Sequence, residues 1–444
     1  MKLENSLNEQ IKSVANRFLE NSKGKEIYVI SHFDTDGITS ATIIIQTLKK
    51  LDKRFAVKIV KNLDEKFVKK LPKDKIILFL DLASGSLNYL SEFSPKNIFI
   101  IDHHEIAQEI PEGINIINSE LHEKQKISAS SLTYLFCKHL TPKNKRLAKL
   151  AILGMTGDLL EKEIDKLNNN ILEDGEIQRK RGLLIYPSTR PLNRTLEYCS
   201  SPFIPGVTGN IKGVLELLRE AGLNPENGKY KSLIELNSEE MEKLTTSIML
   251  RNPKAKSKKI IGDIFLIKMF NKLEDARELS AIVNACSRLG HSEVAIQFCM
   301  ESEKAKKSAE TIHVRYKQHL ISGLKYISEL EKIQGRDFVI INAENKIKDT
   351  MIGTITTILQ HSALYEDGTI LVSLAYYDDR IKISARVIGD NGRNAREILS
   401  KVIEKIGGEV GGHSVAAGAN IHRNKEQEFI KNLRKELEIE VIKI

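Results

Sequence analysis

The sequence predicts an α/β protein with an N-terminal parallel-sheet domain, a smaller C-terminal α/β domain, a helical or irregular connection that joins them, and an active-site cleft between them. Three observations support this prediction. The chain has 444 residues, more than one hydrophobic core usually serves. From Glu26 to about Asp158, short runs that are apolar throughout alternate with helical patterns, which is typical of strands buried on both faces of a parallel sheet. The same alternation returns after Gly335.

The N-terminal domain is expected to place its ligand site at the carboxyl ends of its strands, as parallel sheets generally do. The predicted strands are Ile27–Ser31, Phe55–Val60, Ile76–Asp81 and Ile98–Ile101, and the predicted helices are Thr39–Leu51, Ala129–His139 and Lys145–Leu153.

The middle of the chain has weaker patterns. We expect a helical stretch over about Ile164–Leu184 and an irregular connection over Tyr186–Gly209, because the latter is rich in proline and glycine. Arg190 and Arg194 in this connection are either solvated linker residues or phosphate contacts. Helices are expected near Asp275–Ser287 and Lys304–Leu330. The C-terminal domain is expected to contain the strands Phe338–Asn342, Ile370–Ala375, Ile381–Val387 and Ala416–Ile421, and the helices Thr350–His361, Asn394–Ile406 and Lys425–Leu437.

The composition favours a globular cytoplasmic protein with a polyanionic partner. The apolar runs are far shorter than the roughly 18 residues of a membrane span, and the first residues lack the basic-then-apolar order of a secretion signal. The 68 basic and 59 acidic side chains leave a net charge of +9, which favours phosphate contacts. The four cysteines have no CxxC spacing and are expected to be reduced, mostly core residues.

The first candidate motif is His32-Phe33-Asp34-Thr35-Asp36-Gly37, between a predicted strand and a predicted helix. In an extended segment, residues 32, 34 and 36 point to one side, so one imidazole and two carboxylates can converge on a metal ion. Gly37 permits the turn into the helix. Taken alone, the motif could equally be an Asp N-cap with a chance histidine upstream.

Three more motifs place polar residues at the ends of apolar segments. Asp81 closes the run Ile76–Leu80, where a carboxylate costs free energy unless it is paired or ligated. Asp158 follows the last residues of an apolar helix, where it could merely belong to a terminal turn. A third apolar run ends in Asp102, His103 and His104.

The four motifs together predict a site for two divalent cations. Carboxylate oxygens and imidazoles without a thiolate suit Mn²⁺ or Mg²⁺ better than zinc. The set is large enough for two ions that share one carboxylate. Two ions ~3.5–4 Å apart stabilise both the attacking and the leaving oxygen in phosphoryl displacement.

Over about residues 26–160, the motifs HxDxDG, Asp, DHH and a late Asp resemble the DHH phosphoesterase superfamily. The resemblance implies that His32, Asp34 and Asp81 hold one metal ion. It implies that the second ion is held by Asp36, Asp81, His103 and Asp158. It also implies catalytic roles for Asp102, as the partner of His103, and for His104, which would face the substrate phosphate or assist the second metal.

The segment Gly411-Gly412-His413-Ser414-Val415-Ala416-Ala417-Gly418 resembles the GGGHxxAAG signature of the DHH-associated domain, with Val410 at the first glycine position. The resemblance implies that Gly411, Gly412, His413 and Arg386 bind substrate phosphates. It divides the chain into a DHH catalytic domain (1–185), a connecting and inserted region (186–330) and a DHH-associated substrate-binding domain (331–444). The segment from Asp275 to Arg288 is also similar to archaeal RecJ-like proteins, although an amphipathic core helix explains it equally well.

The resemblance implies a RecJ-like exonuclease that uses two Mn²⁺ or Mg²⁺ ions to hydrolyse single-stranded DNA, RNA or both in replication or repair. Tyr376 and Tyr377 are either base-stacking platforms or partly buried strand residues. One alternative is an oligoribonuclease or small-nucleotide phosphodiesterase of the same superfamily. The other is a scaffold with residual nuclease activity that binds replication or repair proteins such as helicase-associated factors.

Overall fold

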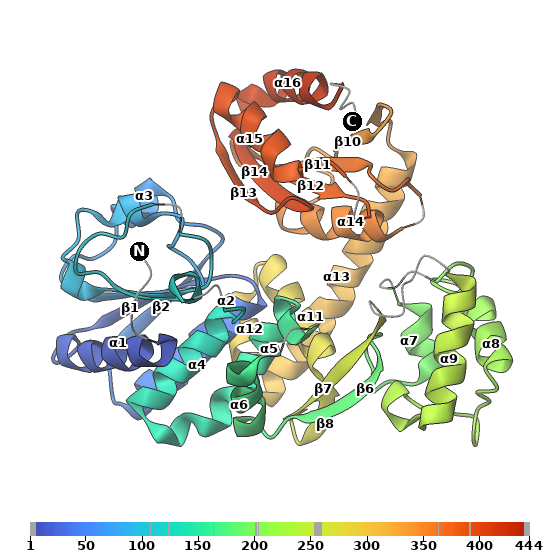
Figure 1. Ribbon diagram of the computed structural model, residues 1–444, viewed down its shortest axis with the longest axis horizontal. Coiled ribbons are helices and arrows are strands. Elements are labelled where there is room, and N and C mark those ends of the chain that lie inside the picture. The colour runs from blue at the N-terminus through green and yellow to red at the C-terminus, as the bar shows by residue number, and fades with distance from the viewer. Residues whose placement is uncertain are drawn as a thin grey trace. The chain divides into compact units, whose positions relative to one another are not determined.

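The computed structural model of the protein describes residues 6–106, 108–122, 125–162, 164–199, 202, 204–252, 260–362, 364–389 and 392–438. The chain divides into two compact units (Figure 1). The first contains a five-stranded and a three-stranded sheet, and the second contains a six-stranded sheet. The first unit comprises Met1–Thr195, Leu217–Met249 and Pro253–His313, and the second comprises Leu196–Glu216, Leu250–Asn252 and Val314–Ile444. In the described part of the chain, no helix has the length and hydropathy that a membrane span requires.

The first unit is built on five parallel strands in the order β2-β1-β3-β4-β5. The strands are β1 (Ile27–His32), β2 (Phe55–Val60), β3 (Ile76–Leu80), β4 (Ile98–Asp102) and β5 (Asn115–Asn118). All five strands point the same way, so their carboxyl ends share one edge of the sheet.

The strand register brings polar residues into one row at this edge. Leu80 of β3 pairs with Ser31 of β1 on one side and with Ile101 of β4 on the other, and Ile101 pairs with Ile117 of β5. The residues that follow these four therefore lie side by side across the sheet. They are His32, Asp81, Asp102 and Asn118.

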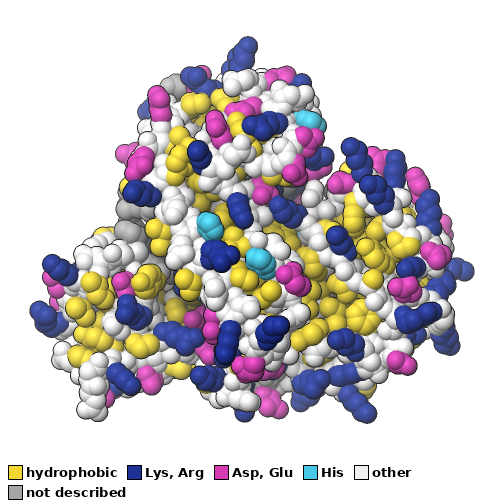
Figure 2. All heavy atoms as spheres, turned by 180° about the vertical axis from the view of Figure 1, so that it is seen from behind, with side chains coloured by type: hydrophobic (Ala, Val, Ile, Leu, Met, Phe, Trp, Pro, Cys, Tyr) yellow, Lys and Arg dark blue, Asp and Glu magenta, His cyan; other side chains and the backbone are white. Residues whose placement is uncertain are grey.

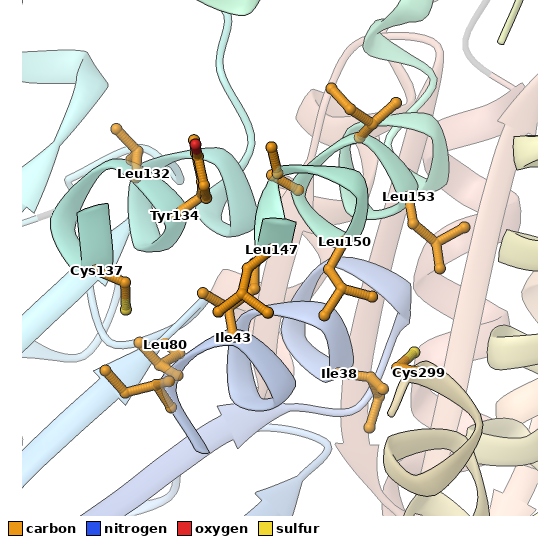
Figure 3. Close-up of a cluster of buried hydrophobic side chains, with 14 of the residues drawn as sticks. Ile38, Ile43, Leu80, Leu132, Tyr134, Cys137, Leu147, Leu150, Leu153 and Cys299 are labelled. Atoms are coloured by element: carbon orange, nitrogen blue, oxygen red, sulfur yellow. The ribbon is translucent and has the colours of Figure 1, made fainter. Parts of the chain in front are cut away.

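Both faces of the sheet are buried, as the unbroken apolar runs predicted. The helices of the unit's first half are α1 (Leu7–Asn21), α2 (Thr35–Lys50), α3 (Glu65–Val68), α4 (Ala129–Leu140), α5 (Ala148–Gly157) and α6 (Lys166–Asp174). One face packs against α1, α2, α4 and α5 in the main core. Figure 3 shows Ile38 and Ile43 of α2 close to Leu150 of α5 in that core. The other face is covered by α3 and the turns after β3 and β4, with Val68, Leu87 and Leu90 buried.

The middle of the chain adds a three-stranded antiparallel sheet in the order β6-β7-β8 and a series of helices. The strands are β6 (Gln178–Leu183), β7 (Ile261–Met269) and β8 (Lys272–Asp275), and the helices are α7 (Leu192–Glu197), α8 (Ile211–Glu220), α9 (Ser238–Arg251), α11 (Ala276–Arg288), α12 (Ser292–Cys299) and α13 (Glu303–Glu329). The apolar face of α11, with Leu279 and Val283, belongs to the main core.

The second unit contains a six-stranded mixed sheet in the order β13-β14-β12-β11-β10-β9. The strands are β9 (Ile333–Gln334), β10 (Phe338–Asn342), β11 (Ile370–Tyr377), β12 (Arg380–Val387), β13 (Glu409–Gly412) and β14 (Ala416–His422), and the helices are α14 (Asp349–His361), α15 (Ala395–Ile406) and α16 (Glu426–Glu438). Helices α15 and α16 pack on one face and close a separate core. The α/β class and the two sheet domains are thus confirmed.

Three predicted elements are wrong in part. The stretch Ile164–Leu184 is not one helix, because α6 ends at Asp174 and Gln178–Leu183 forms β6. Strand β6 pairs with β7, about eighty residues later, and such a distant partner overrides a local helical pattern. The connection Tyr186–Gly209 is not irregular throughout, since it contains α7. The helix expected at Thr39 begins at Thr35, directly after its N-cap Asp34.

Gly154 lets α5 approach α2 and α4 closely. A Cβ atom at Gly154 would lie 2.1 Å from Ser130 Oγ and 2.5 Å from both Asp36 Oδ1 and Thr39 Oγ1. These distances are far below van der Waals contact. A glycine inside a helix is otherwise unfavourable by roughly 0.5–1 kcal/mol relative to alanine, so close packing explains this one.

We therefore expect Gly154→Ala to lower the free energy of unfolding by about 1–3 kcal/mol, the usual cost of overpacking. Urea denaturation measures this change. Gly85→Ala is the control, because a Cβ atom there meets nothing within 4 Å. Equal stability of the Gly154→Ala variant and the wild type would contradict the packing argument.

Candidate metal centre

Asp34 uses its two oxygens for different purposes. Oδ1 accepts a hydrogen bond from the backbone N–H of Gly37 at 3.0 Å and so caps α2. Oδ2 lies 3.0 Å from Nδ1 of His32 at the end of β1. The N-cap and the candidate ligand, which the sequence presented as alternatives, are therefore both present in one side chain.

Asp36 reaches the site from the first turn of α2. The prediction that residues 32, 34 and 36 share one face of an extended segment was wrong, since the helix begins at Thr35. The two Asp36 oxygens instead accept hydrogen bonds from the backbone N–H groups of Ala129 and Ser130, at 2.7 and 3.0 Å. These donors belong to the first turn of α4, whose positive dipole end stabilises the buried carboxylate.

Gly37 is required by close contact and not by turn geometry. A Cβ atom at this position would lie 2.2 Å from the backbone oxygen of His32. The absence of a side chain therefore allows the start of α2 to lie directly against the end of β1.

Asp81 lies at the centre of the cluster. Its side chain is only 1% exposed, and its two oxygens have no hydrogen-bond partner among the described residues. Oδ2 lies 3.3 Å from Nδ1 of His32, and Oδ1 lies 3.4 Å from Nε2 of His103. The backbone of Asp81 has φ 59°, a left-handed conformation that costs about 1–3 kcal/mol and is concentrated at functional sites in proteins.

His103 joins Asp81 to the two remaining carboxylates. Its Nε2 lies 3.5 Å from Oδ2 of Asp158 and 3.9 Å from Oδ2 of Asp36. Asp158 is the C-cap of α5, and its Oδ2 is buried without a hydrogen-bond partner in the described part of the chain. Asp158 thus belongs to both a helix-terminal turn and the cluster.

Asp102 holds the imidazole of His104 and not that of His103, which corrects the expected pairing. Its Oδ1 lies 2.7 Å from Nδ1 of His104 and accepts the backbone N–H of His103 at 2.8 Å. Its Oδ2 accepts the backbone N–H of Ser84 at 3.0 Å. The carboxylate of Asp102 faces the backbone of Ser84 and the ring of His104, whereas Nε2 of His103 lies near the carboxylates of Asp36, Asp81 and Asp158.

The crowding of charges raises the pKa of two imidazoles and of two carboxyl groups in the cluster. Burial alone would lower the pKa of His32 and His103, but the adjacent carboxylates outweigh it and raise the pKa of both imidazoles well above the usual value. Burial, reinforced by the charge of Asp81, raises the pKa of Asp36 to about 6. Burial and the charge of Asp36 raise the pKa of Asp158 well above the usual range. Without a cation, the cluster therefore holds extra protons.

This donor set fits divalent cations. Three groups of side chains each bring their ligand atoms within 4.8 Å of one another: His32 with Asp34 and Asp81, Asp36 with His103 and Asp158, and Asp81 with His103 and His104. Asp81 belongs to two of these groups, and its buried oxygens lack hydrogen-bond partners among the described residues. Oxygen donors with imidazoles and no thiolate suit Mn²⁺ or Mg²⁺, and a shared carboxylate suits two neighbouring ions.

The candidate substrate-binding residues lie in the second unit. Gly412 has φ 111°, and a Cβ atom there would lie 2.5 Å from the backbone oxygen of Ala416, so this position needs glycine. His413 follows in an exposed turn. Gly411 has open space at its Cβ position. Arg386 is engaged within the unit, since its Nε donates to Oγ1 of Thr357 at 3.0 Å.

Two other candidate positions are engaged within the protein. Nε of Arg190 lies 3.3 Å from Oε1 of Glu278, and Nη2 of Arg190 lies 3.5 Å from Oε2 of Glu274. Arg190 is therefore paired with two carboxylates and is not a solvated linker residue. Arg423 stacks on the ring of Tyr376 at 4.3 Å from the centroid.

Helix α11 supports the first motif, a role that the sequence did not reveal. Oδ1 of Asn284 accepts the backbone N–H of Thr35 at 3.2 Å, and Oγ1 of Thr35 donates to the backbone oxygen of Ser280 at 3.1 Å. Ser280 and Asn284 are four residues apart and share one face of the helix. That polar pair on an otherwise apolar face was the available signal.

Comparison with known families gives three matches along the chain. The family described as "DHH family, N-terminal domain" matches residues 26–156. The DHH-CID domain matches residues 185–260, and the DHHA1 domain matches residues 336–438.

Comparison with individual proteins gives similar results. An uncharacterized protein of Methanocaldococcus jannaschii is 30% identical over 427 residues, which is 92% of each chain. The structure of RecJ in complex with Mn²⁺ from Thermus thermophilus has a TM-score of 0.62 at 16% identity; the match covers 99% of this chain and 56% of that one, so the present chain spans little more than half of that RecJ. The structure of CDC45 from Entamoeba histolytica has a TM-score of 0.63 at 11% identity, with 97% and 99% coverage.

Addition of Mn²⁺ should stabilise the wild type, by about 2.7 kcal/mol at a hundredfold excess over Kd. Asp81→Asn should lose most of this stabilisation, because it removes the carboxylate shared by two ligand groups. The unfolding of each protein in chelator gives the baseline from which its own metal-dependent stabilisation is measured. Thermal unfolding with Mn²⁺ and with chelator measures both effects.

Asp52→Asn is the matched control, because Asp52 is exposed and also has a left-handed backbone, with φ 51°. Its metal-dependent stabilisation should equal that of the wild type. Wild-type Mn²⁺ affinity in Asp81→Asn would contradict the assignment of a shared ligand.

Metal affinity should rise with pH between about pH 6 and 8, because the cation must displace protons from His32 and His103, and from Asp36 with its pKa of about 6. Calorimetric titration at pH 7 in two buffers of different ionisation enthalpy should show proton release on binding. An affinity that does not change over this pH range would show that the cluster binds metal without losing protons.

Proposed function

Because this chain belongs to the DHH family and has a RecJ-like fold, we propose that it is a metal-dependent exonuclease that hydrolyses phosphodiester bonds in single-stranded DNA, RNA or both. The observation that carries the proposal is the position of Asp81, which is shared between two groups of ligand atoms and lacks any other polar partner among the described residues. Such an arrangement is suited to two cations that act on one phosphate.

We propose that His32, Asp34 and Asp81 hold one Mn²⁺ or Mg²⁺ ion and that a second is held by Asp36, Asp81, His103 and Asp158. When bound, the ions supply the Lewis acidity that activates water and neutralises charge on the phosphate. The Thermus RecJ that shares this fold was solved with Mn²⁺, which supports the choice of ion.

His104 is the proposed contact of the protein with the reacting phosphate. Its side chain is 55% exposed, and its Nδ1 is hydrogen-bonded to Oδ1 of Asp102 at 2.7 Å. The ring therefore has its Nε2 available for the substrate. Asp102 is buried and charged, because its hydrogen bonds and the neighbouring histidines outweigh burial and lower its pKa. Asp102 thus sets the orientation of the His104 ring.

The second unit is the proposed substrate-binding part. In it, the residues proposed to bind the phosphates of the nucleic-acid strand are Gly411, Gly412, His413 and Arg386. We assign catalysis to residues 1–185, substrate binding to residues 331–444, and the connection to residues 186–330. The net charge of +9 supports a polyanionic substrate. Lys and Arg side chains are spread over the whole face seen in Figure 2 and alternate with acidic ones, so the glycine-rich loop is a better guide to the phosphate path than charge alone.

Two other functions remain as candidates. An oligoribonuclease or small-nucleotide phosphodiesterase would use the same metal centre on a shorter substrate. A replication or repair scaffold is suggested by the fold shared with CDC45, and such a role is compatible with catalysis because the cluster contains every ligand that the family resemblance implies.

We expect strong preference for single strands, with stalling at a duplex junction. The candidate ligands are recessed, with Asp81 1% and His103 22% exposed in their side chains. A flexible strand can bring one phosphate to them, whereas a duplex must first open, at ~1.4 kcal/mol per base-pair step. A time course with Mn²⁺ on strands labelled at either end, as DNA and as RNA, measures the preference and the polarity.

His413→Ala serves as the binding control in the same assay, and it should raise KM without loss of bound metal. Equal rates on blunt duplex and single strand would refute the exonuclease proposal. Rapid hydrolysis of dinucleotides without cleavage of longer strands would instead support the small-nucleotide function.

A further inference from the structure

Asn118 connects three segments at the carboxyl edge of the sheet. It ends β5 and is fully buried. Its Nδ2 donates to Oγ of Ser84 at 2.8 Å and to the backbone oxygen of His104 at 2.9 Å, and its Oδ1 accepts the backbone N–H of Glu120 at 2.8 Å. Asn118 thus ties the loop after β3 and the loop after β4 to the turn that follows β5.

These bonds close a ring of four residues. Asn118 donates to Ser84, the backbone N–H of Ser84 donates to Asp102 at 3.0 Å, and Asp102 lies 2.7 Å from Nδ1 of His104. The backbone oxygen of His104 completes the ring at Asn118. His104 is therefore held at two points, its ring by Asp102 and its backbone by Asn118.

The ring has one exposed member. Ser84, Asp102 and Asn118 are fully buried, whereas the His104 side chain is 55% exposed. Nδ1 of His104 is also 3.8 Å from Oδ1 of Asp81, at the centre of the cluster. Hydrogen bonds between buried groups restrict the motion of the residues that they join. Here they restrict His104, whose side chain faces the solvent beside the metal centre.

We propose that Asn118 is a positioning residue that orients His104 toward the substrate phosphate. This inference rests on the proposed function. Asn118 does not touch the substrate. Its hydrogen bond to the backbone oxygen of His104 fixes the position of the His104 backbone, and its bond to Ser84 helps to fix Asp102, which orients the imidazole ring. The sequence signal is an asparagine that closes the apolar pair Ile116 and Ile117, in register with Asp102.

A double-mutant cycle tests the proposal. Asn118→Ala should lower kcat about 10–100-fold, the range that a misplacement of about 1 Å produces, with bound Mn²⁺ unchanged. In a His104→Ala background, the same substitution should have almost no further effect, because the residue that it positions is gone. Equal losses in both backgrounds would overturn the proposal, since a merely structural role would be additive.

Asn115→Ala is the matched control. Asn115 begins the same strand, is 2% exposed, and donates from Nδ2 to the backbone oxygen of Ile98 at 3.1 Å. Its loss should lower the stability to a similar extent while kcat per folded molecule stays at the wild-type level. A fall in kcat equal to that of Asn118→Ala would show that loss of stability, and not positioning, explains the result.

Amide hydrogen exchange separates this inference from the proposed function. In Asn118→Ala, the amides of Ser84 and His104 should exchange at least about tenfold faster, and in Asn115→Ala they should not, because each lost buried hydrogen bond is worth about 1–1.5 kcal/mol. If the wild type cleaves no single-stranded DNA or RNA, the proposed function fails. Unchanged exchange at these amides in Asn118→Ala would refute the hydrogen-bonded ring that joins Asn118 to His104.

Discussion

The concentration of carboxylates at one sheet edge is the constraint on which the first unit depends. Asp34, Asp36, Asp81 and Asp158 surround two imidazoles within a few ångströms, and Asp36 and Asp81 are almost completely buried. Buried like charges are unfavourable unless they are protonated, hydrogen-bonded or paired with a cation. The raised pKa of Asp36 and of Asp158 expresses this cost.

The surrounding elements reduce the cost in distinct ways. The first turn of α4 donates two backbone hydrogen bonds to Asp36, and Asp34 caps α2 with one of its oxygens. Close packing at Gly37 and Gly154 brings these helix termini to the strand ends. Asp81 receives no comparable support from the described residues, and its backbone is left-handed. The fold thus stabilises Asp34 and Asp36 by backbone hydrogen bonds, whereas both oxygens of Asp81 and Oδ2 of Asp158 have no such partner among the described residues and suit a cation.

Sequence patterns predicted the fold well wherever structure is local. Strand β3 and residues 98–101 of β4 are apolar throughout, and such runs indicate a strand that is buried on both faces. The segment Gln178–Leu183 was misassigned because its strand conformation depends on β7, which begins at Ile261. The short strand β5 went unpredicted because Asn115–Asn118 contains only two apolar residues, and only its position beside β4 makes it a strand.

The sequence by itself determined the class of the fold, the identity of the candidate ligands and their place after strands, because each of these follows from residues that are neighbours in the chain. Only the tertiary structure decided what each ligand contacts. Asp36 meets the start of α4 from more than ninety residues away, Asp102 orients His104 and not His103, and Asn118 reaches back to Ser84. Strand register and helix packing set these contacts, and both arise from interactions between segments that local patterns do not contain.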